Sequence, residues 1–182
     1  MGTVHLMELQ RLLRAITDFL TAGDHPFALV GGLALAAYGR VRTTLDLDLV
    51  VDGGAQDALV AFLEATGYET LHRSPGYSNH LHGDRDWGRV DVVYVRGETS
   101  QALFAGASPM AGPGGVTIPI PRPEHLAAMK VLAMKNDPER TLQELADIRY
   151  LMTLPGVDRE EIRGYFSRHG LEERYRELAA GL

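Results

Sequence analysis

The sequence predicts an α+β fold in which a mixed β-sheet is flanked by helices and followed by a C-terminal helical part. Between residues 27 and 120, short aliphatic and β-branched runs alternate with segments of helical spacing. After Pro121 and Pro123 only helical patterns remain, separated by proline and glycine breaks. We therefore expect two domains, residues 1–122 and residues 123–182.

Each element follows from its local pattern. Apolar residues at helical spacing predict helices over residues 3–22, 33–38 and 56–66. Strands are predicted over residues 27–30, 43–51, 68–72, 78–82, 89–95 and 116–120. Residues 105–115 are rich in Gly, Ala and Pro and are expected to form a loop. The C-terminal part is expected to hold helices over residues 123–135, 138–152, 158–169 and 171–180.

The composition excludes several classes of protein. The 182 residues contain no cysteine, which excludes disulfides, thiolate catalysis and a zinc site with Cys ligands. A formal net charge of -6 excludes a broad basic surface that follows a nucleic-acid backbone. No apolar run reaches the roughly 18 residues of a membrane helix, and the first residues form an amphipathic helix pattern rather than a signal peptide. We expect a cytoplasmic protein with no membrane partner.

The strand over residues 43–51 carries two acids. Asp46 and Asp48 are two residues apart, so both carboxylates project from one face of the strand, about 6–7 Å apart at the backbone. Aspartate is disfavoured in strands. Asp91 lies in another aliphatic run, where a neighbouring strand could bring it beside the first two. The plain alternative for Asp46 and Asp48 is a solvated edge strand whose charges prevent aggregation.

Three clustered carboxylates predict a divalent cation. At an effective dielectric constant near 20, two carboxylates 4 Å apart repel by about 4 kcal/mol, and a bound cation removes that cost. Oxygen ligands with room for water and phosphate suit Mg²⁺, and three carboxylates can hold two ions on either side of a transferred phosphoryl group. We expect two Mg²⁺ ions, which Mn²⁺ could replace, bound by Asp46, Asp48 and Asp91.

A glycine pair precedes the acids. Gly31 and Gly32 follow a predicted strand and open a helix, where backbone N–H groups can face an anion. Arg42 and Thr44 lie between this turn and the acids. Backbone donors, a cation and metal-binding acids together suit a nucleoside triphosphate. The plain alternative for the two glycines is a tight turn with no ligand.

The motif from Val30-Gly31-Gly32 to Asp46-Leu47-Asp48 resembles the signature of nucleotidyltransferases of the DNA polymerase beta superfamily, and Asp91 is similar to the third acid of that superfamily. The resemblance implies an Mg²⁺-dependent enzyme that moves a nucleoside monophosphate from an NTP, ATP among them, to an acceptor hydroxyl and releases pyrophosphate. It implies that Asp46, Asp48 and Asp91 are catalytic. Many relatives have Ser where this chain has Gly32. A hydroxyl contact to the phosphate is therefore missing here, and backbone N–H groups must bind the phosphate instead.

The C-terminal part is similar to the helical tail of the antibiotic-modifying and toxin-like branch, which includes abortive-infection toxins of type IV toxin–antitoxin pairs. In that branch a lysine on this helix and an acid on the next assist the active site, and Lys130 and Asp147 match in residue type and rough position. The resemblance implies that Lys130 helps Arg42 and Thr44 to hold the triphosphate. Charge pairing on a helix surface is the alternative for both residues.

Several acceptors stay open on sequence grounds. The acceptor could be a tRNA end, a protein or a small molecule such as an antibiotic, and a toxin would have an antitoxin partner. A different hypothesis is a catalytically inactive protein-binding module with the same fold. The three intact acids argue against it, because an unused carboxylate cluster costs stability.

Overall fold

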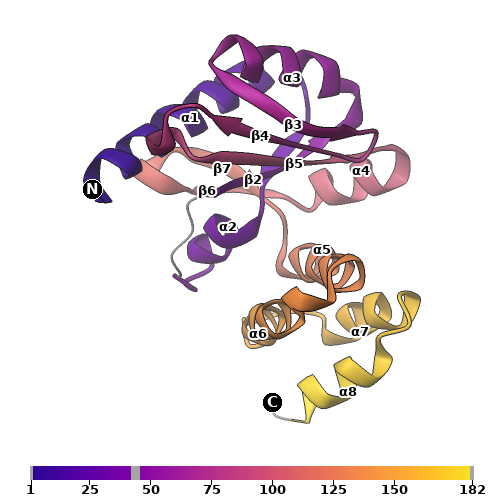
Figure 1. Cartoon of the computed structure of the whole chain (residues 1–182). Coiled ribbons are helices and arrows are strands. Elements are labelled where there is room, and N and C mark those ends of the chain that lie inside the picture. The colour runs from indigo at the N-terminus through magenta and orange to yellow at the C-terminus, as the bar shows by residue number, and fades with distance from the viewer. Residues whose placement is uncertain (1, 42–45, 181–182) are drawn as a thin grey trace. The chain divides into compact units, whose positions relative to one another are not determined.

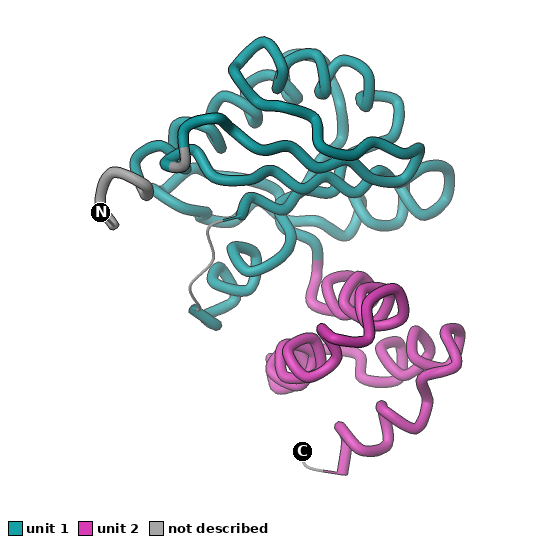
Figure 2. Tube along the Cα trace, in the orientation of Figure 1, with its two compact units in different colours: residues 1–121 teal, residues 122–182 magenta. Residues whose placement is uncertain are grey.

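The computed structural model describes residues 2–41 and 46–180, and the chain divides into two compact units, Met1–Pro121 and Arg122–Leu182 (Figure 2). The sequence placed this division between residues 122 and 123. The predicted fold class is confirmed, since a mixed sheet with helices forms the first unit and helices form the second.

Five of the described strands of the first unit form one sheet in the order β1-β2-β5-β4-β3 (Figure 1), and two later strands form a separate ribbon. Only β2 and β5 run parallel among these neighbours, and the other pairs are antiparallel. The bounds are β1 Phe27–Leu29, β2 Asp46–Asp52, β3 Tyr68–Ser74, β4 Tyr77–His82 and β5 Arg89–Val95. The parallel pair at the centre of the sheet brings together the two strands that carry the predicted acids.

Helices cover both faces of this sheet. In Figure 1, α1 (Gly2–Ala22) and α3 (Gln56–Ala65) lie on one face, and α2 (Gly31–Ala37) lies on the other. The apolar stripe of α1 is fully buried at Leu13, Ile16 and Leu20, as its spacing predicts. The rings of Phe19 and Phe62 stack with centroids 4.3 Å apart and link α1 to α3.

The predicted loop over residues 105–115 is wrong in part. Ser108–Ala111 forms strand β6 and pairs antiparallel with β7, Thr117–Ile120. Pro109 and Pro119 are register partners in this ribbon. The two backbone N–H groups that proline lacks are therefore missing at the same position, and the other residue pairs can still form hydrogen bonds. The sequence also missed helix α4, Gly97–Ala105, which begins at a glycine with a positive φ of 59°.

Within the described residues, the second unit contains helices only: α5 Pro123–Asn136, α6 Thr141–Leu151, α7 Arg159–Arg168 and α8 Glu172–Ala179. Short 3-10 turns lie at Gly53–Ala55, Arg85–Trp87 and Pro113–Gly115 in the first unit and at Pro138–Arg140 in the second unit. Ile148, Ile162 and Phe166 form a fully buried core between the helices. Among the residues described, none of the helices has the length and apolar character needed to cross a membrane.

Candidate active site

The two acids of β2 face away from the core formed by α1 and α3. Leu47 and Leu49 are fully buried, whereas Asp46 is exposed and Asp48 is partly buried. This alternation is what a strand imposes on neighbouring residues. The predicted placement of both carboxylates on one face is therefore present in the structure.

Asp91 lies beside Asp48. In the parallel pair formed by β2 and β5, Asp48 is the register partner of Asp91, and Asp46 is the partner of Arg89. Neighbouring strands are about 4.8 Å apart, and paired residues share a face. Asp48 and Asp91, which lie 43 positions apart in the sequence, thus come together through strand pairing.

Gly31 lies directly against the Asp48 carboxylate. A Cβ atom added at Gly31 would fall onto Asp48 Oδ2, and the φ of 65° at Gly31 is one that other residues rarely adopt. The Val30 N–H donates to the backbone oxygen of Asp48 at 2.9 Å, which fixes the end of β1 against β2. Glycine is thus required at position 31 by backbone conformation and by the neighbouring acid.

The glycine pair belongs to the first turn of α2, because this helix begins at Gly31 and not at residue 33 as the sequence predicted. Gly32 is buried and Gly31 is partly buried. The first-turn N–H groups of a helix have no acceptor within the helix, so those of Gly31 and Gly32 are suited to a ligand oxygen. Arg42 and Thr44 lie outside the described residues.

Two side chains that sequence reasoning missed hold Asp91. The Tyr77 hydroxyl donates to Asp91 Oδ1 at 2.9 Å, and Arg89 Nε donates to the same oxygen at 3.0 Å. Burial and the neighbouring Asp91 raise the pKa of Tyr77 to about 12. The Arg89 contact had a sequence signal, since residues two apart in a strand share a face. The Tyr77 contact depends on the pairing of β4 with β5.

The donor atoms at this site suit a divalent cation in their chemistry. Asp48 and Asp91 present carboxylate oxygens from adjacent strands, and such hard ligands are preferred by Mg²⁺. Among residues 2–41 and 46–180, however, no three His, Cys, Asp or Glu side chains are already arranged to bind a metal ion. Asp48 and Asp91 are the pair of carboxylates that fits a cation. Asp46 lies two residues before Asp48 on the same face of β2.

Lys130 is buried in the second unit. Its Nζ donates to Glu144 Oε2 and to Asp147 Oδ2, both at 2.7 Å, and Lys130 is only 7% exposed. Arg140 pairs with the other oxygen of Glu144 at 2.7 Å, as its spacing of four residues on a helix predicts. Lys130 thus links α5 to α6, and its predicted contact with triphosphate stays a prediction.

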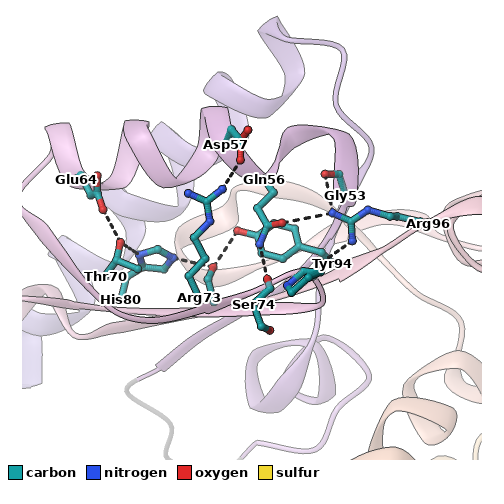
Figure 3. A network of polar contacts seen from close by, with 12 residues as sticks. Gly53, Gln56, Asp57, Glu64, Thr70, Arg73, Ser74, His80, Tyr94 and Arg96 are labelled. Atoms are coloured by element: carbon teal, nitrogen blue, oxygen red, sulfur yellow. Dashed lines mark hydrogen bonds and ion pairs between the residues drawn. The ribbon is translucent and has the colours of Figure 1, made fainter.

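A chain of hydrogen bonds crosses the opposite face of the sheet (Figure 3). The Thr70 hydroxyl donates to Glu64 Oε1 at 2.7 Å, so it accepts from His80 Nδ1 at 3.1 Å. His80 Nε2 then accepts from the Ser78 hydroxyl at 2.8 Å, and Ser78 accepts from the Tyr94 hydroxyl at 2.9 Å. With His80 neutral and its proton on Nδ1, every hydrogen bond in this chain has one donor and one acceptor.

The buried His80 predicts a pH dependence of stability. Burial lowers the pKa of His80, so as the pH falls through about 6.5 the unfolded chain binds a proton there before the folded chain does. The free energy of unfolding, measured with urea, is expected to fall as pH drops from about 7.5 to about 5. The slope should be shallower in His80→Gln and unchanged in His72→Gln, which alters an exposed histidine of the same sheet. Equal slopes in all three proteins would contradict this.

The sheet order and the acids paired on β2 and β5 define the class of protein: the chain has the fold of the nucleotidyltransferases. The predicted resemblance is confirmed for the fold. Among solved structures, the antibiotic-resistance factor ANT(2'')-Ia, studied in solution, is similar with a TM-score of 0.68 and 19% identity, over 100% of this chain and 98% of that chain.

Two further solved structures support the same fold. ANT(2'')-Ia in complex with adenylyl-2''-tobramycin has a TM-score of 0.59 and 16% identity, over 99% of this chain and 98% of that chain. The lincosamide antibiotic adenylyltransferase LnuA, with lincomycin bound, has a TM-score of 0.51 and 18% identity, over 78% of this chain and 94% of that chain. No protein-family model and no curated protein matches the sequence.

Proposed function

We propose that this chain is an Mg²⁺-dependent nucleotidyltransferase, which moves a nucleoside monophosphate from an NTP to an acceptor hydroxyl and releases pyrophosphate. One observation carries the proposal. Asp48 and Asp91 are register partners on adjacent strands, and the backbone of Gly31 lies against Asp48 at the start of a helix. This places a carboxylate pair beside backbone donors for phosphate, the combination that nucleotidyl transfer requires.

Each residue has a role in this reaction. The N–H groups of Gly31 and Gly32, together with Arg42 and Thr44, bind the triphosphate. Asp91 accepts the proton of the acceptor hydroxyl, whose oxygen attacks the α-phosphorus as the bond to pyrophosphate breaks. Asp46, Asp48 and Asp91 would hold two Mg²⁺ ions, or Mn²⁺ in their place, which supply charge neutralisation at the phosphates when bound.

The acceptor that we favour is a hydroxyl of a small-molecule antibiotic. The observation behind this choice is the match to ANT(2'')-Ia over nearly the full length of both chains. The experiments below can also identify a different acceptor, either a tRNA end or a protein. They can likewise show growth arrest, which is expected of a toxin that has an antitoxin partner.

Nucleotide binding is tested first by thermal unfolding. An NTP with Mg²⁺, at about a hundred times its Kd, is expected to raise the Tm by about 5–10 °C. The shift should vanish in the double variant Asp46→Asn with Asp48→Asn. No shift with any of the four NTPs would count against the proposal.

The acceptor is tested by transfer of label. The protein is incubated with α-³²P-labelled NTPs and a cell lysate or an antibiotic panel, and the label is sorted into RNA, protein and small molecules. We expect label in a small molecule, and resistance rather than growth arrest when the chain is expressed. Partner capture that persists in a triple Asp→Asn variant, with no transfer by the wild type, would favour the inactive binding module.

A further inference from the structure

The Asp91 carboxylate is held through one of its two oxygens. Oδ1 accepts from Tyr77 at 2.9 Å and from Arg89 at 3.0 Å. Within residues 2–41 and 46–180, no hydrogen bond or ion pair reaches Oδ2. The two oxygens of a carboxylate are chemically equal in water, so these contacts make them different.

Strand pairing creates this arrangement. Tyr77 begins β4 and Arg89 begins β5, and the antiparallel pairing of the two strands places Tyr77 opposite Val93, two residues beyond Asp91. Tyr77 and Arg89 lie on the face of the sheet that carries Asp48 and Asp91. The phenol of Tyr77 reaches Asp91 diagonally across the strand pair, and the guanidinium of Arg89 reaches it along β5. Because both donors start from strands, the carboxylate is held by rigid elements.

Resting on the proposed function, we infer that Tyr77 and Arg89 are positioning residues that fix Asp91 through Oδ1, so that Oδ2 is the oxygen that receives the acceptor proton. In this step the O–H bond of the acceptor breaks and an Oδ2–H bond forms. The freed electron pair forms the new bond to the α-phosphorus, and the bond to the leaving pyrophosphate breaks. A carboxylate that rotates freely would present the reacting oxygen in only a fraction of encounters.

The hydroxyl of Tyr77 is a donor throughout the pH range of an assay. A phenol ordinarily keeps its proton at neutral pH, so the Tyr77 hydroxyl can donate to Asp91 there. Arg89 keeps its charge in the same range. Both groups can therefore donate to Asp91 Oδ1 in that range.

The kinetic test uses Tyr77→Phe, which removes only the hydroxyl. We expect kcat for nucleotidyl transfer to fall about tenfold, the equivalent of one hydrogen bond of about 1.4 kcal/mol, while the KM for NTP changes less than about twofold. Arg89→Gln should lower kcat in the same direction. The matched control is Tyr94→Phe, which removes a buried hydroxyl from the opposite face of β5. This control should leave kcat unchanged even if it lowers Tm.

A second measurement reports on the contact without turnover. In protein labelled with ¹³C at tyrosine Cζ, Asp91→Asn is expected to move the Tyr77 signal and to leave the Tyr94 signal in place. If the wild type transfers nucleotide and Tyr77→Phe retains wild-type kcat, or if the Tyr77 signal does not respond, the inference is overturned and the proposed function stands. If the wild type transfers no nucleotide to any acceptor, both are overturned.

Discussion

Replacing Asp48 by Asn is expected to lower kcat/KM for nucleotidyl transfer by about 10³-fold, and to leave the fold intact. Asp48 is the acid that adjoins both Asp91 and the Gly31 backbone, so its charge acts where cation and phosphate would meet. A carboxylate that binds a catalytic cation contributes several kcal/mol of stabilisation in the transition state, and the neutral amide cannot replace it. Transfer of labelled monophosphate, measured against substrate concentration, gives the ratio directly.

Asp57→Asn provides the matched control for this prediction. Asp57 is also an aspartate in the first unit, but it is exposed on α3 and pairs with Arg73. Its variant should keep wild-type transfer. In metal-free buffer the Tm of Asp48→Asn should stay within about 2 °C of the wild type, because the amide has nearly the same size and shape as the carboxylate that it replaces. An active Asp48→Asn protein would remove this acid from the mechanism.

Replacing Lys130 by Met is expected to lower the free energy of unfolding by about 3–5 kcal/mol, because it leaves Glu144 and Asp147 as buried carboxylates without their shared cation. Glu144 is 1% exposed and Asp147 is fully buried, so water cannot take over the role of the ammonium. Urea unfolding followed by circular dichroism measures the loss. Neutralising both acids in the same chain should recover part of it.

The only other lysine of the chain provides the comparison. Lys135 lies near the end of the same helix and is exposed, so Lys135→Met should change the unfolding free energy by less than about 0.5 kcal/mol. A different result is expected if Lys130 acts chiefly on the triphosphate. In that case Lys130→Met would keep its stability and raise the KM for NTP, and the salt-bridge interpretation would be wrong.

The parts of the site that the sequence predicted are those encoded locally. Asp46 and Asp48 share a face because a strand alternates its side chains, and this holds wherever the strand lies. The strand that carries Asp91 was also predicted from its aliphatic run, and its place beside β2 then followed from the pairing of two buried strands. Whether these acids bind metal stays a prediction.

The parts that the sequence missed depend on contacts between distant segments. Tyr77 and Asp91 are 14 positions apart and meet only in one register of β4 and β5. A shift of the register by one residue would turn Tyr77 to the other face. The strand Ser108–Ala111 was hidden by its proline, whose effect depends on the residue opposite it. The partners of Lys130 likewise depend on how α5 packs against α6.

The contact between Gly31 and Asp48 makes the residue allowed at position 31 depend on the residue at position 48. The position that any larger side chain at 31 would need is already taken by an atom of the acid at 48. An evolving lineage can therefore lose the acid and keep the glycine, but it cannot gain a side chain at 31 while the acid stays in place. A homologue with a side chain at position 31 should therefore have lost the acid at position 48 first. The residue at position 31 can then distinguish inactive proteins of this fold from active enzymes.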